Sequence, residues 1–349
     1  MRRGLRFPVA VVGACLGIVW ASRSPAVTNG TQAGSFLLIA PGARPAAMGE
    51  AFTGLADDVS AASWNPAGLS QLGGMETSLS YAAWFADTSY SVVGLGSPIA
   101  PGHVLAGTLY YFHVPRIANV PDEVEPGVDL TNYALGASYA WQVSQRLSVG
   151  GGLKLLSQDI VQKDRPQSAG AGAMVDLGMQ YRLEGPGVTL GLALQNMGPK
   201  LAFRDASSPA PFWARAGSCW RAYSDEWLKV LFTGDVAQPV ETGYKLVIPS
   251  GGFSDIFKMS LRHPAQNRYN YGLGTEWWVA DVLALRAGWA IRVGTDISSP
   301  TAGAGLRFSV DPCTYSLDYS YAFWEDLSAN ISRVSFTLGY HPRPHESAE

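Results

Sequence analysis

The chain has 349 residues, of which 15% are charged, and its formal net charge at pH 7 is −3. Typical soluble domains carry about 25% charged residues. The low charge, together with 39 Gly, 11 Trp and 15 Tyr, favours strands that face lipid on one side and a wet interior on the other. The net negative charge and the lack of any basic run in the sequence argue against a nucleic-acid partner.

Residues 1–26 have the layout of a secretory signal peptide. Three arginines precede an apolar run at 9–20, and small residues follow that run. A membrane anchor is the alternative, but this run is too short to cross a hydrocarbon layer of about 30 Å. Cys15 weakly resembles a lipoprotein cleavage site, although it lies in the middle of the apolar run. We therefore predict an exported protein, cleaved after Ala21 or Ala26.

Residues 27–74 do not alternate and are rich in Gly, Ala and Pro. Asp57, Asp58 and Ser60 are of the residue types that cap helices. Asn65 and Pro66, followed by Ala67 and Gly68, form a turn signal. We expect a compact, partly helical element here, and the alternative is a plain turn that leads into the first strand.

In residues 75–341, apolar and polar side chains alternate with a period of two residues. In the clearest segment, at 314–323, aromatic and apolar side chains alternate with small and polar ones, which is typical of strands with one apolar face. Each segment is long enough for a tilted strand to cross a bilayer, which takes roughly 9–11 residues. About fourteen strands are expected, at 75–85, 88–98, 102–114, 131–142, 146–158, 168–182, 186–197, 211–222, 226–237, 266–279, 282–293, 300–310, 312–324 and 330–340.

The connections between these segments alternate in length. Every second one is very short, whereas 115–130, 198–210 and 238–265 are long. Bacterial barrels have short turns at the periplasmic end and longer loops outside. A soluble β-sandwich also alternates, but it does not predict this regular change in loop length. The sequence therefore predicts an all-β membrane protein, an antiparallel transmembrane β-barrel at 75–341, with a tail at 342–349.

Along each strand, the charged residues occupy the positions that alternate with those of the bulky apolar residues. In lipid each would cost up to about 2–4 kcal/mol, so we expect them to line the interior. They would pair across strands, with Arg307, Asp318 and Arg333 as one such network, or hold a plug, or else form an anion-binding lumen. The expected lumenal residues are Lys154, Arg215, Glu276, Arg286, Arg292, Arg307, Asp318 and Arg333, with Asp176, Arg221, Lys229 and Asp235 on the same face.

No sequence motif points to catalysis or to a cofactor. Outside the signal region, the cysteines are Cys219 and Cys313, and no Cys/His spacing suits a metal. The five histidines lie in no recognisable nucleophile or metal motif. We expect a non-enzymatic protein without a metal or cofactor.

The segment Asn65-Pro66-Ala67-Gly68-Leu69, preceded by Asp57 and Asp58 and by small residues, resembles the N-terminal signature of PorV/PorQ proteins, whose wider relatives are the FadL-like barrels. Segments at 271–278, 285–289, 303–308 and 317–321 resemble the last strands of that family. The resemblance implies a fourteen-stranded barrel in the bacterial outer membrane, with residues 27–74 folded inside it as a hatch. It also implies that Asn65, Pro66 and Ala67 anchor the hatch and have a structural or gating role.

Two functions follow from this resemblance. A PorV-like protein would take part in type IX secretion, and its partners would be secretion proteins and exported cargo besides membrane lipids. The loop at 238–265 carries an apolar load that includes Tyr244, Phe253 and Phe257, and it would dock such a partner. A FadL-like protein would instead transport hydrophobic small molecules across the outer membrane. The shared motif does not distinguish the two.

Overall fold

The computed structural model describes residues 34–84, 87–115, 128–162, 165–185, 187–202, 207–240, 269–293, 297–324 and 329–341. The predicted signal peptide, the tail at 342–349 and the loop with Tyr244, Phe253 and Phe257 lie outside these ranges. Among the residues described, no helix is both long enough and apolar enough to cross a membrane. Cys219 and Cys313 are free thiols.

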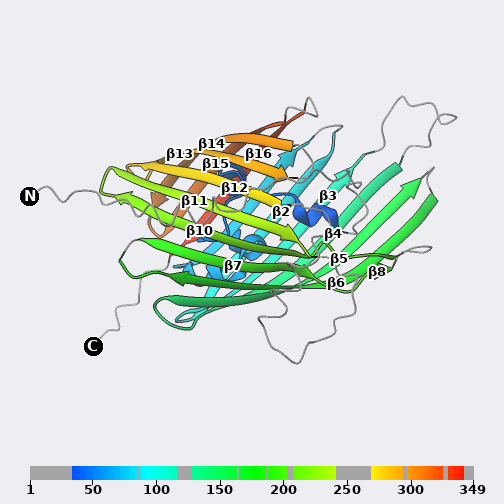
Figure 1. The fold of residues 1–349 in the computed structure, drawn as a ribbon, viewed down its shortest axis with the longest axis horizontal. Helices are drawn as coiled ribbons and strands as arrows, with labels where there is room; N and C mark the ends of the chain where they lie inside the picture. The colour runs from blue at the N-terminus through cyan, green and yellow to red at the C-terminus, as the bar shows by residue number, and fades with distance from the viewer. Residues whose placement is uncertain are drawn as a thin grey trace, which may run out of the picture.

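The described residues form one antiparallel sheet of sixteen strands, two of which, β8 and β9, have only two residues each. The other fourteen build the wall (Figure 1). The strands are β1 (Met75–Ala83), β2 (Ser89–Ala100), β3 (His103–Val114), β4 (Val128–Gln142), β5 (Leu147–Gln162), β6 (Arg165–Arg182), β7 (Val188–Met197), β8 (Leu201–Ala202), β9 (Ser207–Ser208), β10 (Trp213–Ser224), β11 (Leu228–Pro239), β12 (Tyr269–Val279), β13 (Leu283–Val293), β14 (Ile297–Val310), β15 (Cys313–Trp324) and β16 (Ala329–Tyr340).

The sheet closes on itself. Strand β1 pairs with β16, so that Met75 lies opposite Tyr340, and β5 pairs with β6 in register along the strand. The closed order leaves no long edge strand, so each wall backbone can satisfy its hydrogen bonds within the sheet. We call the end of the barrel with Met75, Tyr340 and the short connections the turn end, and the opposite end the loop end.

The structure confirms the predicted fold class, an antiparallel transmembrane barrel of fourteen long strands. Each expected strand is present, with ends that differ by a few residues from the sequence estimate. The short pair β8 and β9 was not predicted. It lies within the expected loop at 198–210, where Leu201 pairs with Ser208 and Ala202 with Ser207.

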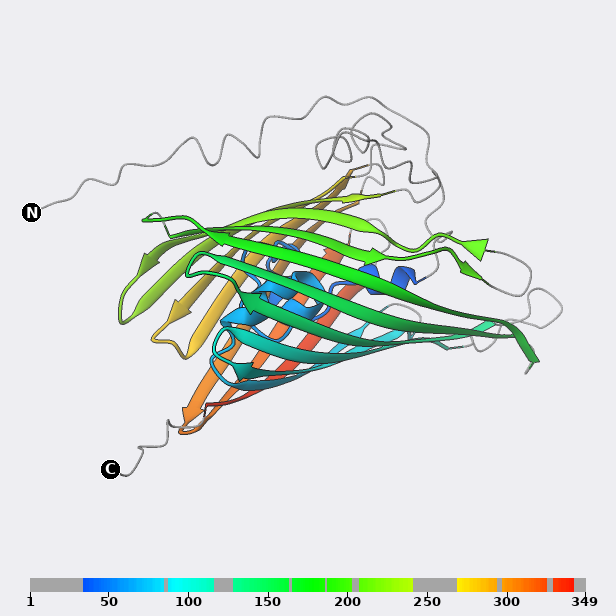
Figure 2. The same cartoon turned by 90° about the horizontal axis from the view of Figure 1, so that it is seen from below.

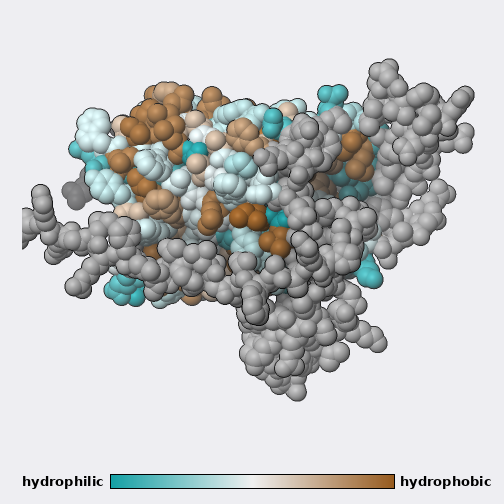
Figure 3. Space-filling view, turned by 45° about the horizontal axis from the view of Figure 1, so that its top comes forward, coloured by the Kyte–Doolittle hydropathy of each residue, from teal (hydrophilic) through white to brown (hydrophobic). Residues whose placement is uncertain are grey.

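The outer surface of the barrel is apolar because the side chains of each strand alternate. Along β15, Leu317 and Tyr319 are exposed, whereas Asp318 and Ser320 between them are buried. Leu135 on β4 is 59% exposed and Val310 on β14 is 67% exposed. Apolar side chains gather over the visible part of the wall in Figure 3. Such a surface is unfavourable in water and favourable in a lipid bilayer.

Residues 34–74, which we call the hatch, lie inside the barrel and contain four short helical segments. Figure 2 shows these helices surrounded by the strands. Most of the hatch side chains are buried, among them Phe52, Trp64 and Leu69. The segments are η1 (Ser35–Leu38), α2 (Ala43–Ala47), α3 (Ala61–Trp64) and η2 (Pro66–Gln71).

We expect arginine in place of Leu135 to impair insertion far more than arginine in place of Val310. Leu135 lies in the middle of β4, whereas Val310 is the last residue of β14 at the turn end. The cost of an outward-facing arginine is about 2–4 kcal/mol at mid-depth and roughly 0–1 near the interface. Folding into lipid vesicles, followed by heat-modifiable gel mobility, measures the difference. Equal folding yields for Leu135→Arg and Val310→Arg would contradict the depth assigned to these positions.

Candidate functional site

Asn65 joins the hatch to the wall through its side-chain amide. Its Oδ1 accepts a hydrogen bond from the backbone N–H of Ala67, 3.3 Å away, and so caps η2. Its Nδ2 donates to the carbonyl of Thr53 within the hatch (2.9 Å) and to that of Met179 on β6 (3.1 Å). Asn65 is fully buried, so loss of this amide would leave a backbone carbonyl and an N–H without a partner.

Glycines in the wall let the backbone after Asn65 approach closely. A Cβ placed on Gly150 of β5 would lie 2.5 Å from the backbone N of Ala67, and one on Gly178 of β6 would lie 2.2 Å from Oδ1 of Asn65. Real Cβ atoms do not approach other atoms so closely. The strands can therefore hold this part of the hatch only because these two positions carry no side chain.

Ser60 lies at the start of α3, where the sequence predicts a helix cap. It is the N-cap residue of α3, but its side chain makes no capping hydrogen bond. Instead Asp58 Oδ1 accepts from both the backbone N–H and the hydroxyl of Ser60. The predicted cap position at Ser60 is confirmed, but its side chain is not free to cap the helix because it bonds to Asp58.

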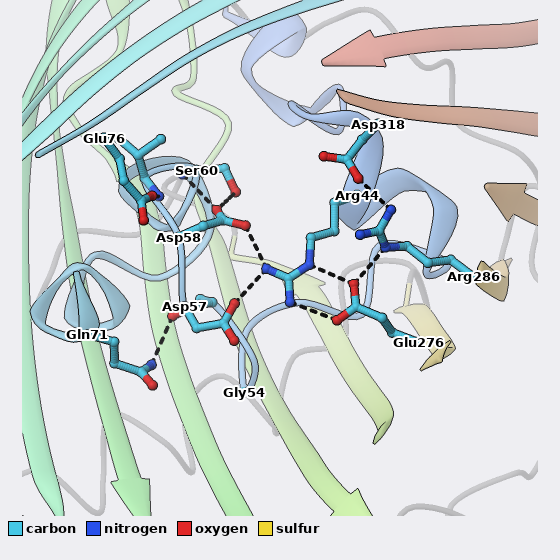
Figure 4. A network of polar contacts seen from close by, with 12 residues as sticks. Arg44, Gly54, Asp57, Asp58, Ser60, Gln71, Glu76, Glu276, Arg286 and Asp318 are labelled. Atoms are coloured by element: carbon cyan, nitrogen blue, oxygen red, sulfur yellow. Dashed lines mark hydrogen bonds and ion pairs between the residues drawn. The ribbon is translucent and has the colours of Figure 1, made fainter. Parts of the chain in front are cut away.

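An ion-pair network connects the hatch to the opposite side of the wall (Figure 4). Arg44 of α2 makes a bidentate contact with Glu276 of β12, with Nε 2.8 Å from Oε2 and Nη2 2.9 Å from Oε1. The remaining Nη1 of Arg44 donates to Asp57 at 2.7 Å and to Asp58 at 2.8 Å. A planar guanidinium suits such simultaneous contacts with carboxylates.

The network continues along the wall. Arg286 of β13 donates from Nε to Glu276 and from Nη1 to Asp318 of β15, both at 2.6 Å. Glu276 is only 1% exposed, and two arginines share its charge. We call this set of six residues the ionic latch: Arg44, Asp57, Asp58, Glu276, Arg286 and Asp318.

Burial and neighbouring charges act in opposite directions on Arg44. Burial alone would lower the pKa of its guanidinium, but the carboxylates of Asp57 and Glu276 raise this pKa well above its ordinary value. Arg44 therefore stays charged, and each partner carboxylate is compensated. Removing the guanidinium would leave Asp58 without its ion-pair partner and Glu276 with Arg286 alone.

The other predicted lumenal charges also point inward but do not all pair with each other. Lys154 forms an ion pair with Asp176 at 2.7 Å, and Arg292 with Glu50 of the hatch at 2.6 Å. Arg215 stacks over the ring of Trp64, and its Nε donates to Gln195. These contacts tie β5, β6, β7, β10 and β13 to one another and to the hatch.

The expected network of Arg307, Asp318 and Arg333 does not form. Asp318 is bonded to Arg286 instead, and Arg307 lies over the ring of Trp278 at 4.0 Å. Arg333 makes no hydrogen bond or ion pair among the described residues. The prediction was wrong because sequence parity gives the face of a strand but not the direction in which a long side chain extends along it.

Several residues that hold the hatch were missed at the sequence level. Arg44 and Glu50 were not selected, since neither lies in a strand pattern. Asp235 of β11 was expected only as a lumenal charge, but its Oδ2 accepts from the backbone N–H groups of Phe52 and Thr53, at 3.1 and 2.8 Å. Arg44 and Glu50, as charges in an otherwise small and apolar segment, were the available signal.

A small recess separates the hatch from β1, β2, β3 and β16. It offers about 40 Å³ to the centres of water molecules, which is room for roughly three waters. Its lining combines hydroxyls of the wall with the hatch backbone and includes Ser78, Ser80, Val92, Thr108, Ser335 and Thr337. Among the described residues no cluster of His, Cys, Asp and Glu could hold a metal ion.

Solved structures share this fold. The CymD monoaromatic hydrocarbon channel matches with a TM-score of 0.60 and 13% identity, over 88% of this chain and 99% of that one. The toluene transporter TbuX of Ralstonia pickettii has a TM-score of 0.55 and 13% identity, over 86% and 97% of the two chains. A FadL homologue of Pseudomonas aeruginosa has 0.56 and 12%, over 87% and 99%. At these identities the similarity concerns the fold alone.

No protein-family model matches the chain, and neither does any of the curated proteins. The solved structures above agree in fold with the wider resemblance to FadL-like barrels. The narrower resemblance to PorV/PorQ and the expected link with type IX secretion gain no support from these comparisons. The loop residues predicted to dock secretion partners lie outside the described part of the chain.

We expect Arg44→Met to loosen the hatch and make the barrel conduct ions. Removing one partner of a buried ion pair costs about 3–5 kcal/mol, and here Glu276 would keep only Arg286 as a counter-charge. Arg146→Met is the matched control, since the Arg146–Glu184 pair is exposed and such pairs contribute roughly 0–1 kcal/mol. Planar-bilayer conductance and thermal unfolding measure both effects. A closed, stable Arg44→Met barrel would show that the ionic latch does not hold the hatch.

Valine at Gly150 is expected to displace the Asn65 motif, whereas valine at Gly151 is expected to be tolerated. The Cβ at position 150 would meet the backbone of Pro66 and Ala67, while the Cβ at 151 has no atom closer than 3.6 Å. The two changes are chemically identical and adjacent in sequence. Limited proteolysis of the folded barrel reports the exposure of the hatch. If both variants were equally resistant, close approach at Gly150 would not be required.

Proposed function

We propose that this chain is an outer-membrane channel for small hydrophobic molecules. The observation that carries the proposal is a closed, lipid-facing barrel whose interior is filled by the segment that precedes β1, held against the wall by side-chain contacts and close backbone approach. A wall of fourteen long strands is wider than its own side chains can fill, since barrels of about eight strands are already at that limit. An internal hatch with a polar latch suits a passage that stays shut until it is needed.

The loop-end half of the lumen supplies an apolar surface for such a molecule. Phe36 of the hatch packs with Tyr90 on β2, Leu156 on β5 and Met174 on β6 in one buried cluster, against which Phe112 on β3 also packs. The turn-end half instead holds the ionic latch, because Glu276 and Arg286 lie close to the β12–β13 turn. At the loop end a hydrophobic molecule would therefore meet this apolar cluster, in the same half of the lumen as Arg333 and the Arg292–Glu50 pair, before it reached the ionic latch.

The fold comparisons support this choice over a role in secretion. The solved structures with the same fold bear names such as monoaromatic hydrocarbon channel and toluene transporter. We carry over from them only the class of ligand, a small and largely apolar molecule. Toluene is the probe that these names suggest.

The test uses a reversible tether between hatch and wall. The hydroxyls of Ser70 on η2 and Ser148 on β5 lie 2.8 Å apart, so cysteines at these positions would be placed to form a disulfide. We expect Ser70→Cys/Ser148→Cys, in a Cys313→Ser background, to block uptake of labelled toluene by intact Gram-negative cells, and reductant to restore it. The single variant Ser70→Cys is the control.

Two results would contradict the proposal. If cells with the unmodified protein take up toluene no faster than cells with an empty vector, the channel function fails. If the oxidised double variant transports as fast as the control, passage does not need the hatch to move.

A further inference from the structure

Within the part of the chain that the structure describes, one buried arginine in the lumen has no hydrogen-bond or ion-pair partner. Arg333 on β16 is 4% exposed, and its Nε is buried without a hydrogen-bond partner. Among the described residues it takes part in no hydrogen bond and no ion pair, whereas Lys154, Arg286 and Arg292 each face a carboxylate. A buried charge without compensation is strongly unfavourable. A ligand that offers an acceptor to Arg333 would therefore stabilise it.

Two further polar groups near Arg333 are also unpaired. Ser320 on β15 lies directly opposite Arg333, and Ala82 on β1 lies opposite it on the other side. Tyr90 on β2 is opposite Ala82, which places it in the same row about 10 Å from Arg333 between Cα atoms. The hydroxyls of Ser320 and Tyr90 are buried and have no hydrogen-bond partner. Three donors thus face one part of the lumen.

The nearby carboxylates are already engaged. Glu50 is bonded to Arg292 at 2.6 Å, and Asp318 to Arg286 at the same distance. Asp235 accepts hydrogen bonds from the hatch backbone. The group missing at Arg333 is therefore an acceptor with negative charge, and a guanidinium flanked by hydroxyls suits a carboxylate.

We propose that Arg333, with Ser320 and Tyr90, binds the carboxylate of a small aromatic acid. Aromatic rings surround the apolar side of this position, since Tyr90 packs edge-on against Phe112 with ring centroids 6.3 Å apart, and Phe112 stacks with Phe36 at 6.0 Å. Offset and edge-on packing against these rings suits a planar aromatic body. The carboxylate distinguishes this ligand from a neutral hydrocarbon.

The small recess described above limits the size of the ligand, although its lining residues lie two positions further along the strands than Arg333 and Tyr90. Ser335, Ser80 and Val92 line this recess, and each lies two residues along its strand from Arg333, Ala82 and Tyr90, respectively, on the same face. The recess holds only a few waters, so a compact acid fits with a small shift of the hatch and a long-chain one does not. This inference rests on the proposed function, because it names the ligand that would enter the same lumen.

Binding of benzoate to the purified, full-length protein in detergent tests the site. Calorimetry is expected to show binding by the unmodified protein and at least a tenfold weaker affinity for Arg333→Met, as the loss of charged hydrogen bonds implies. Arg307→Met is the matched control, a lumenal arginine that lies over Trp278, and it should bind benzoate as the unmodified protein does. Arg333→Lys keeps the charge and should retain part of the affinity.

Thermal unfolding provides a second, independent readout. Without ligand, Arg333→Met should melt at a higher temperature than the unmodified protein, because it removes a buried charge that has no hydrogen-bonded partner among the described residues. Benzoate should raise the melting temperature of the unmodified protein but not that of the variant. A purely structural role for Arg333 predicts the opposite result, a lower melting temperature for Arg333→Met.

The inference is overturned if benzoate does not bind the unmodified protein, or if it binds Arg333→Met equally well. Toluene uptake separates this result from the proposed function. Uptake of toluene without benzoate binding would leave the channel and remove the acid site. Binding of benzoate that depends on Arg333, without any uptake of toluene, would leave the site and remove the hydrocarbon channel.

Discussion

A hydrocarbon layer offers no hydrogen-bond partner to a peptide group, and this constraint shapes the whole molecule. Each strand must pair on both sides, and the contact of β1 with β16 and of β5 with β6 closes the ring. Once the wall is closed, its backbone groups are engaged in the ladder. The hatch therefore has few main-chain partners in the wall, and side chains such as Asn65, Asp235 and Glu276 provide its attachments.

The wall pairs through its backbone and holds the hatch through its side chains, and this difference explains where polar residues are found. The outward positions carry apolar side chains because they meet lipid, and the inward positions carry glycine or polar groups because they meet the hatch. Gly150 and Gly178 admit its backbone, and the arginines and carboxylates on neighbouring strands hold its helices. Since buried pairs of charges contribute less to stability than their Coulomb energy suggests, we infer that the ionic latch serves to position the hatch rather than to hold the barrel together.

The strands were predictable from sequence because period-two alternation is a local signal, repeated fourteen times. The short hairpin of β8 and β9 was not, since two-residue strands carry no such rhythm. The latch was equally inaccessible: Arg44 and Glu276 are 232 positions apart, and only the closed barrel brings them together. Parity placed Arg307, Asp318 and Arg333 on one face, but the direction of each side chain depends on neighbours that the sequence does not identify, such as Trp278 beneath Arg307.

The two halves of the lumen differ in the interactions that a ligand would have to break as it moved through them. At the loop end, Phe36 and its neighbours offer dispersion contacts that can be exchanged for similar contacts with an apolar molecule. At the turn end, Arg44 and Glu276 would lose directed, charge-assisted hydrogen bonds that a hydrocarbon cannot replace. A ligand can therefore displace Phe36 and its apolar neighbours without compensation by charge, whereas displacing the latch requires an alternative partner for each ion. The latch would accordingly be the last barrier on the path and the one that decides when the barrel opens.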